Sequence, residues 1–170
     1  MTIPEVSTRL RLLGFLQKQF GAVSFSAKLT SNQSISHDTW TTVALDEETF
    51  SGDGYDTSTY AFTAPYDGKY YFYASALWTI MASTNDSVYL RFLKNAGEAS
   101  EQEYTVYAEV GSAQVSLTDY TIQGSIILSL NARDTVGVQV KYYNSAAATE
   151  AIYGSSDTDK QYTQFFGYKI

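Results

Sequence analysis

Alternation of apolar and polar side chains limits the fold of this chain more than any other feature of its sequence. In residues 68–80, GKYYFYASALWTI, Phe72 and Trp78 belong to one set of alternate positions, and Tyr71 and Tyr73 belong to the other. The same period of two recurs in residues 87–95, 125–130 and 134–143. Successive side chains of a β-strand point to opposite faces, so the pattern predicts half-buried strands.

Turn residues separate these segments and indicate how the strands are connected. Asp67-Gly68, Asn95-Ala96-Gly97 and residues 131–134 combine Asn, Asp and Gly, which are favoured in tight turns. Short strands with such punctuation, and without helical periodicity between them, are typical of antiparallel sandwiches and jelly rolls. We therefore predict an all-β jelly-roll sandwich of about ten antiparallel strands over residues 23–170, preceded by a short α-helix.

Composition excludes several classes of protein. The chain of 170 residues has a net charge of -7 and no cysteine, which argues against nucleic-acid binding, a disulfide framework and sulfur-ligated zinc. The N-terminal segment has no basic leader before its apolar residues, and no apolar run approaches the roughly 20 residues of a membrane span. We expect neither a signal peptide nor a membrane span.

Residues 1–20 have a different periodicity from the rest of the chain. Apolar positions fall at spacings of three and four, and Pro4 stands where the first turn of a helix tolerates it. The predicted helix is an anchor or trimerising segment whose apolar positions include Ile3, Val6, Leu10, Leu13 and Phe20. A helix this short is marginal alone, so it packs on its own domain, bundles with other copies or docks into a partner.

Residues 55–72, YDTSTYAFTAPYDGKYYF, resemble the central signature of the globular head of complement component C1q. Further matches follow in the order of that family: residues 23–29, Phe50 with Tyr55 and Asp56, residues 124–140, and residues 163–170. The resemblance implies a ten-stranded jelly roll, related to tumour necrosis factor, that assembles as a homotrimer. This sequence departs from the family at Tyr60 and Arg133, where a Gly is usual, and residues 96–123 are longer and more polar than expected.

Aromatic residues occupy both sets of alternate positions in several strands. On a monomer the second set would form an exposed apolar patch, and large patches of that kind mark interaction sites. Tyrosine suits an interface between copies of the chain because its ring supplies contact area while its hydroxyl stays hydrogen-bonded. The alternative is that the 15 tyrosines decorate a polar β-surface. The predicted oligomer interface comprises Tyr70, Tyr71, Phe72, Tyr73, Phe165 and Tyr168.

No motif in the sequence indicates catalysis. His37, the single histidine, lies in a Ser-rich segment without a nucleophile motif, so we expect a protein that is not an enzyme. Asp53 and Asp56 are the best oxygen donors for a calcium ion, although the EF-hand spacing is absent and no cofactor is otherwise expected. Trp40 and Trp78 are candidate stacking residues for a glycan ligand.

These features favour a homotrimeric head that works by presenting loops and by self-assembly. Its build resembles bacteriophage structural proteins, so we predict a virion surface protein, either a fibre knob or a capsid decoration, or an extracellular location. Residues 1–20 would attach it to another virion or scaffold protein, and the head would recognise a host-surface glycan or protein. The alternatives are a secreted head that recognises glycans or proteins and, less favoured, a glycan hydrolase that uses two facing carboxylates.

Overall fold

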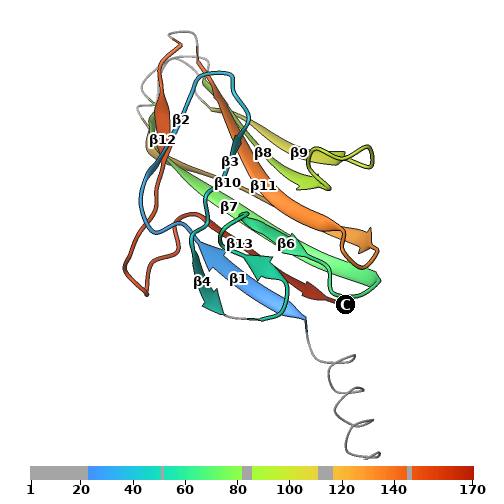
Figure 1. Ribbon diagram of the computed structural model, residues 1–170. Coiled ribbons are helices and arrows are strands. Elements are labelled where there is room, and N and C mark those ends of the chain that lie inside the picture. Colours follow the sequence, from blue (N-terminus) through green and yellow to red (C-terminus); the bar gives the residue numbers. More distant parts are fainter. Residues whose placement is uncertain (1–22, 51, 82–85, 111–116, 145–146) are drawn as a thin grey trace, which may run out of the picture.

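The computed structural model describes residues 23–50, 52–81, 86–110, 117–144 and 147–170. The predicted helix over residues 1–20, with Ile3, Val6, Leu10, Leu13 and Phe20, lies outside these described residues. The described residues form 13 strands in two antiparallel sheets, which lie face to face as the layers of a sandwich (Figure 1). The prediction of an all-β jelly roll is confirmed.

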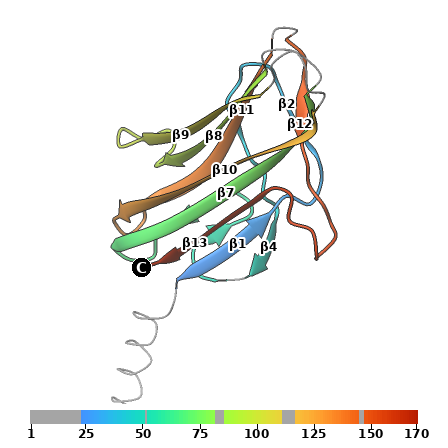
Figure 2. The same ribbon diagram turned by 180° about the vertical axis from the view of Figure 1, so that it is seen from behind.

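The seven-stranded sheet runs through β2 (Gln33–Ile35), β12 (Glu150–Ile152), β7 (Gly68–Met81), β13 (Gln164–Lys169), β1 (Ser24–Lys28) and β4 (Glu47–Phe50), with β10 (Leu117–Leu130) also paired to β7. The six-stranded sheet runs through β5 (Tyr55–Asp56), β6 (Ala61–Thr63), β11 (Thr135–Tyr143), β8 (Asp86–Lys94) and β9 (Gln102–Val110), with β3 (Thr41–Thr42) also paired to β11. Figure 2 shows β10 and β7 as long neighbouring strands in the first of these layers.

The core follows from the predicted alternation. Tyr70, Phe72 and Trp78 point inward from β7 and are 0% exposed, and β11 alternates between half-buried and buried residues up to its exposed last residue. The ring of Phe25 lies 5.0 Å from that of Phe62 on the opposite sheet and 4.9 Å from that of Phe165. Burying one such ring stabilises the fold by about 1.5–3 kcal/mol. This aromatic cluster therefore joins the two sheets.

Two turns contain the residues at which the sequence departs from the C1q pattern that it resembles. Tyr60 has a φ of 56° and Arg133 a φ of 77°, both in the left-handed region that favours glycine. At both positions a residue with a side chain therefore adopts a conformation that suits the glycine expected from the resemblance. Asn95, with a φ of 53°, and Gly97, with a φ of 77°, form the turn predicted after β8.

Candidate oligomer interface

The three central strands of the seven-stranded sheet carry two rows of side chains on the face that points away from the core. Ile127, Tyr71 and Tyr168 are cross-strand neighbours on β10, β7 and β13. In the next row, Tyr73 has Ser125 on one side and Phe166 on the other. Cross-strand pairs of this kind are close enough for rings and aliphatic groups to pack.

The rings of the two rows form a continuous ladder. The centroids of Tyr71 and Tyr168 are 5.2 Å apart, those of Tyr73 and Phe166 are 5.0 Å apart, and those of Tyr71 and Phe166 are 6.4 Å apart. The Tyr73 hydroxyl donates a 2.7 Å hydrogen bond to Oε1 of Gln123. The rings are therefore held in fixed positions with a polar group satisfied at the edge of the ladder.

Much of this apolar surface faces outward in the single chain. Ile127 is 58% exposed, Tyr168 is 44% exposed, and Ile170, directly after β13, is 56% exposed. Tyr71, Tyr73 and Phe166 are half-buried by each other. Neither row contains a charged side chain. A rigid, uncharged patch of rings and branched aliphatics is the composition found at the centre of protein interfaces.

The segment between β12 and β13 limits the patch at one end. Lys28 is on the same outward face of β1 but is 0% exposed, and its Nζ donates a 2.9 Å hydrogen bond to the carbonyl of Asp157 in this segment. Glu47 Oε1 lies 3.3 Å from the same Nζ. Burying this ammonium group is tolerated because both partners compensate for its lost hydration. The aromatic ladder lies beyond this covered end of the sheet.

Comparison with known proteins identifies the family. The sequence pattern of the C1q domain matches residues 24–168 of this chain. The chain belongs to the C1q-domain family. No curated protein matches it in sequence.

Solved structures confirm the fold of this C1q domain. The globular domain of zebrafish complement 1qA protein is similar with a TM-score of 0.55 and 16% identity, covering 87% of this chain and 97% of the other. Eiger TNF from S. frugiperda gives a TM-score of 0.63 at 11% identity, covering 88% and 92% of the two chains. Murine APRIL at pH 5.0 gives a TM-score of 0.61 at 12% identity, covering 88% of this chain and 99% of the other. At these identities the likeness concerns the fold.

The predicted interface residues divide between the two faces of the sheet. Tyr71, Tyr73 and Tyr168 lie on the outward ladder. The prediction for Tyr70, Phe72 and Phe165 is wrong, because all three are 0% exposed in the single chain and pack in the core between the sheets. Phe166, Ile127 and Ile170 lie on the same outward side but were not predicted, although the alternation of the last strand places Phe166 and Ile170 in register with Tyr168.

The two tryptophans also lie in different surroundings. The prediction that Trp78 stacks on a ligand is wrong, because it is 0% exposed and its ring lies 5.6 Å from that of Tyr142 in the core. Trp40 is half-buried at the outer side of the six-stranded sheet, where the guanidinium of Arg91 lies 4.2 Å from its ring centroid. Such a cation–π contact fixes both side chains on the sheet.

Asp56 has a structural role in the turn after β5. Its Oδ1 accepts hydrogen bonds of 2.7 Å from the Ser58 hydroxyl and 2.8 Å from the Ser58 N–H, and these bonds lower the pKa of the Asp56 carboxyl. Within the described part of the chain, Asp53 and Asp56 belong to no group of three or more His, Asp or Glu side chains that could hold a metal ion. The described residues also contain no helix long and apolar enough to cross a membrane.

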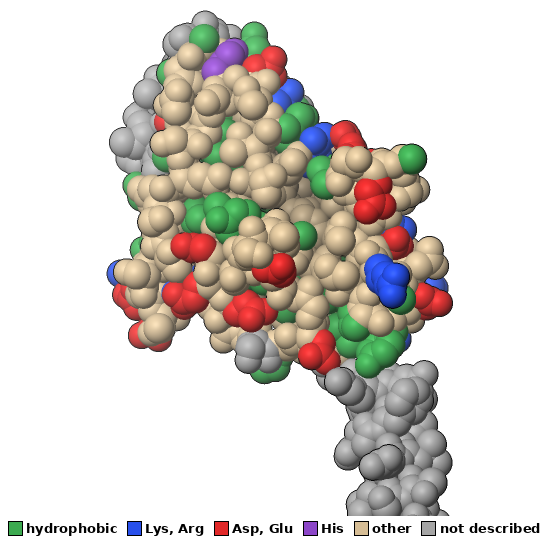
Figure 3. All heavy atoms as spheres, in the orientation of Figure 1, with side chains coloured by type: hydrophobic (Ala, Val, Ile, Leu, Met, Phe, Trp, Pro, Cys, Tyr) green, Lys and Arg blue, Asp and Glu red, His purple; other side chains and the backbone are tan. Residues whose placement is uncertain are grey.

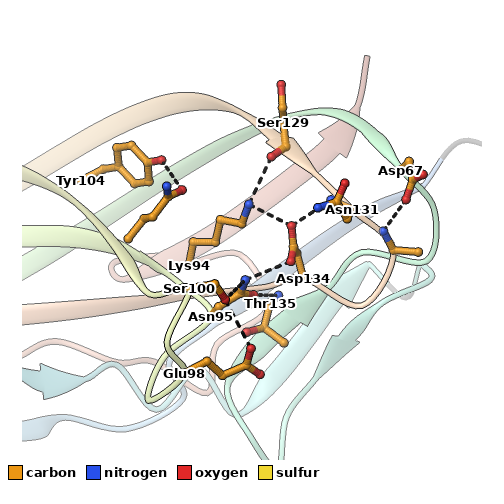
Figure 4. A network of polar contacts seen from close by, with 12 residues as sticks. Asp67, Lys94, Asn95, Glu98, Ser100, Tyr104, Ser129, Asn131, Asp134 and Thr135 are labelled. Atoms are coloured by element: carbon orange, nitrogen blue, oxygen red, sulfur yellow. Dashed lines mark hydrogen bonds and ion pairs between the residues drawn. The ribbon is translucent and has the colours of Figure 1, made fainter.

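A polar network fixes the hairpin between β10 and β11 to the end of β8 (Figure 4). Asp134 accepts hydrogen bonds from the Asn95 amide at 2.9 Å and from the Asn131 N–H at 2.8 Å, and its carboxylate lies 2.9 Å from Lys94 Nζ. Burial opposes the charged carboxylate, but Lys94, Asn95 and Asn131 outweigh it and lower the pKa of Asp134 to about 2. Asn95 is 4% exposed and also accepts from the Thr135 N–H.

Proposed function

We propose that this C1q domain is a non-enzymatic binding module that assembles as a homotrimer through the outward face of β13, β7 and β10. Domains of the C1q and tumour necrosis factor families are typically non-enzymatic binding modules and commonly form homotrimers. The observation that carries the proposal for this chain is the uncharged ladder of Tyr71, Tyr73, Phe166 and Tyr168, with Ile127 exposed beside it.

The energetics of this face favour burial against copies of itself. Burying apolar surface contributes about 25 cal/mol per Å², and a typical stable interface buries about 800 Å² on each partner. The rings are held by cross-strand packing, so ordering them at an interface costs little conformational entropy. Because no ion pair has to be stripped of water in these two rows, little electrostatic cost opposes the gain.

The wider setting of the trimer rests on sequence features. Domains of this family are typically extracellular, and we infer a virion surface or extracellular location for this one. The coiled-coil spacing of residues 1–20 supports attachment to another virion or scaffold protein. The head would then present its loops and its six-stranded sheet to a host-surface glycan or protein. On the face drawn in Figure 3, acidic side chains are spread out rather than gathered in one patch.

Sedimentation equilibrium of the full chain tests the assembly. We expect a species of about three times the chain mass of 18.9 kDa at micromolar concentration. Ile127→Asp places a charge in the ladder and should give a folded monomer, because an unpaired carboxylate is costly to bury. Thr105→Asp is the matched control on exposed β9 of the other sheet, and it should remain trimeric. A wild-type protein that sediments with the mass of one chain would disprove the proposal.

A further inference from the structure

A small hollow lies on the outer face of the six-stranded sheet, on the side of the sandwich opposite the aromatic ladder. It has a volume of 80 Å³ and lies over β11 and the start of β6. Its lining includes Thr42, Tyr60, Leu93, Thr135, Gly137 and Gln139. None of the described residues that line it is charged.

Gly137 creates the hollow. It lies in the middle of β11, with Ala61 and Leu93 as its neighbours on the two adjacent strands. A Cβ built at this position would have the Tyr60 carbonyl oxygen, at 3.7 Å, as its nearest neighbour, which is an ordinary contact. The backbone therefore does not require glycine there. Glycine weakens a strand interior and often marks the close approach of a ligand.

Tyr60 lies at the edge of the hollow, in a turn that hydrogen bonds hold in place. Its backbone is in the left-handed region, with a φ of 56°, and its N–H donates a 2.8 Å hydrogen bond to the Asp56 carbonyl. The Asp56 carboxylate accepts two hydrogen bonds from Ser58, which hold the same turn. Non-glycine residues in this conformation are uncommon, and they occur preferentially at ligand-binding sites.

A chain of oriented polar groups ends at the hollow. Arg91 Nε donates a 2.9 Å hydrogen bond to Oε1 of Gln139, which fixes the orientation of the amide. Gln139 Nε2 then donates to the Thr42 hydroxyl at 3.2 Å. Since that hydroxyl oxygen already accepts, its own hydrogen is available for a ligand acceptor. The hollow thus offers the Tyr60 carbonyl oxygen on one side and directed donors on another.

The charges nearby are neutralised within the protein. Arg91 contacts Glu103 at 2.5 Å in addition to Gln139, and Lys141 Nζ lies 2.9 Å from Asp38 Oδ1. An anionic ligand would have to compete with these carboxylates. A purely apolar ligand would leave the Thr42 hydroxyl and the Gln139 amide without the hydrogen bonds that water provides. A ligand with hydroxyls and an uncharged carbon face satisfies both conditions.

We propose that this hollow binds one ring of a neutral saccharide, with the apolar lining around Leu93 packing against the carbon face of the sugar and Thr42 and Gln139 donating to its hydroxyls. This proposal rests on the proposed function of the domain as a binding module, but it does not depend on trimerisation. It lies on the sheet that does not contribute to the aromatic ladder. A trimer would therefore display one such site on the outer side of each copy.

Saturation-transfer NMR on the full chain, with glucose, galactose, mannose and N-acetylglucosamine as separate probes, tests this proposal. At least one sugar should show transfer to its ring protons, with a dissociation constant on the order of 1 mM, which is typical of one small contact surface. Absence of transfer from all of these neutral sugars to folded protein would overturn the proposal. Sedimentation of the same sample reports trimerisation separately, so failure of one proposal is distinguishable from failure of the other.

Gly137→Val fills the hollow and should weaken sugar binding by about tenfold or more. Thr42→Val removes the hydroxyl while keeping the shape of the side chain, and it should also weaken binding. Thr105→Val changes an exposed β9 residue outside the hollow, so it should bind like the wild type. The urea midpoint of each variant shows whether it is folded. Unchanged transfer in folded Gly137→Val would also overturn the proposal.

Discussion

A residue with a side chain in a left-handed backbone conformation should lower the stability of the fold, and Arg133 is such a residue. Arg133 has a φ of 77° in the hairpin between β10 and β11, where a side chain costs about 1–2 kcal/mol. Arg133→Gly should therefore raise the free energy of unfolding by about 0.5–1 kcal/mol, after the entropy that glycine adds to the unfolded chain. Urea denaturation measures this change. Ala132→Gly, at the neighbouring exposed position without a positive φ, should lower stability. A lower midpoint for Arg133→Gly would contradict the argument.

The contacts of the Asp134 carboxyl make the stability of the fold depend on pH. Its pKa is lowered from 3.8 to about 2, so the unfolded chain binds the proton more tightly than the folded chain. The resulting stability is fully present above about pH 4 and is lost as the pH falls through about 2. Allowing for solvent screening, we expect the Asp134 carboxylate to contribute about 1 kcal/mol to the free energy of unfolding. Asp134→Asn should remove this part of the pH dependence in urea unfolding series at pH 4 and pH 2. The same loss of stability between pH 4 and pH 2 in the wild type and in Asp134→Asn would refute this role of Asp134.

At the scale of the strands, alternation predicted where the long elements lie and left open which face of them is buried. In β7 both sets of positions carry rings, so Phe72 and Tyr71 are equivalent by pattern, and only the packing of the second sheet decides between them. β9 was not predicted, because its charged residues are typical of a loop, yet Glu103 pairs with Arg91 across the strands. The excess over about ten strands includes two-residue elements such as β3 and β5.

Two glycines in central strands offer a matched test of the packing. A Cβ at Gly167 in β13 would lie 2.5 Å from the Phe72 ring and 2.9 Å from the Tyr71 carbonyl, whereas a Cβ at Gly137 in β11 has no neighbour closer than 3.7 Å. Gly167→Ala should therefore destabilise the protein by about 1–3 kcal/mol through overpacking. Gly137→Ala should be neutral or stabilising by about 0.5–1 kcal/mol, because alanine suits a strand better than glycine. Similar urea midpoints for the two variants would contradict this reading of the core.

For the whole molecule, the sandwich separates its two outer faces by composition. The seven-stranded sheet presents an uncharged aromatic ladder, whereas Arg91, Glu103, Lys141 and Asp38 form ion pairs at the outer side of the six-stranded sheet. Burial of the apolar face in the proposed closed assembly would leave the polar face toward the surroundings. The net charge of -7 on each chain would then keep the proposed trimers apart from one another in solution.

Either the head or residues 1–20 could hold the proposed trimer together. If the ladder of β7, β10 and β13 provides the interface, Leu10→Asp with Leu13→Asp should leave the full chain trimeric while abolishing its attachment to a virion or scaffold partner. These substitutions put charges on the predicted helical seam, where they would disrupt packing with any partner helix. Ile127→Asp should instead give a monomer that keeps its attachment through residues 1–20, because the introduced charge lies on the head. Sedimentation of both variants distinguishes the two arrangements: a monomeric Leu10→Asp, Leu13→Asp protein beside a trimeric Ile127→Asp protein would assign the assembly to residues 1–20.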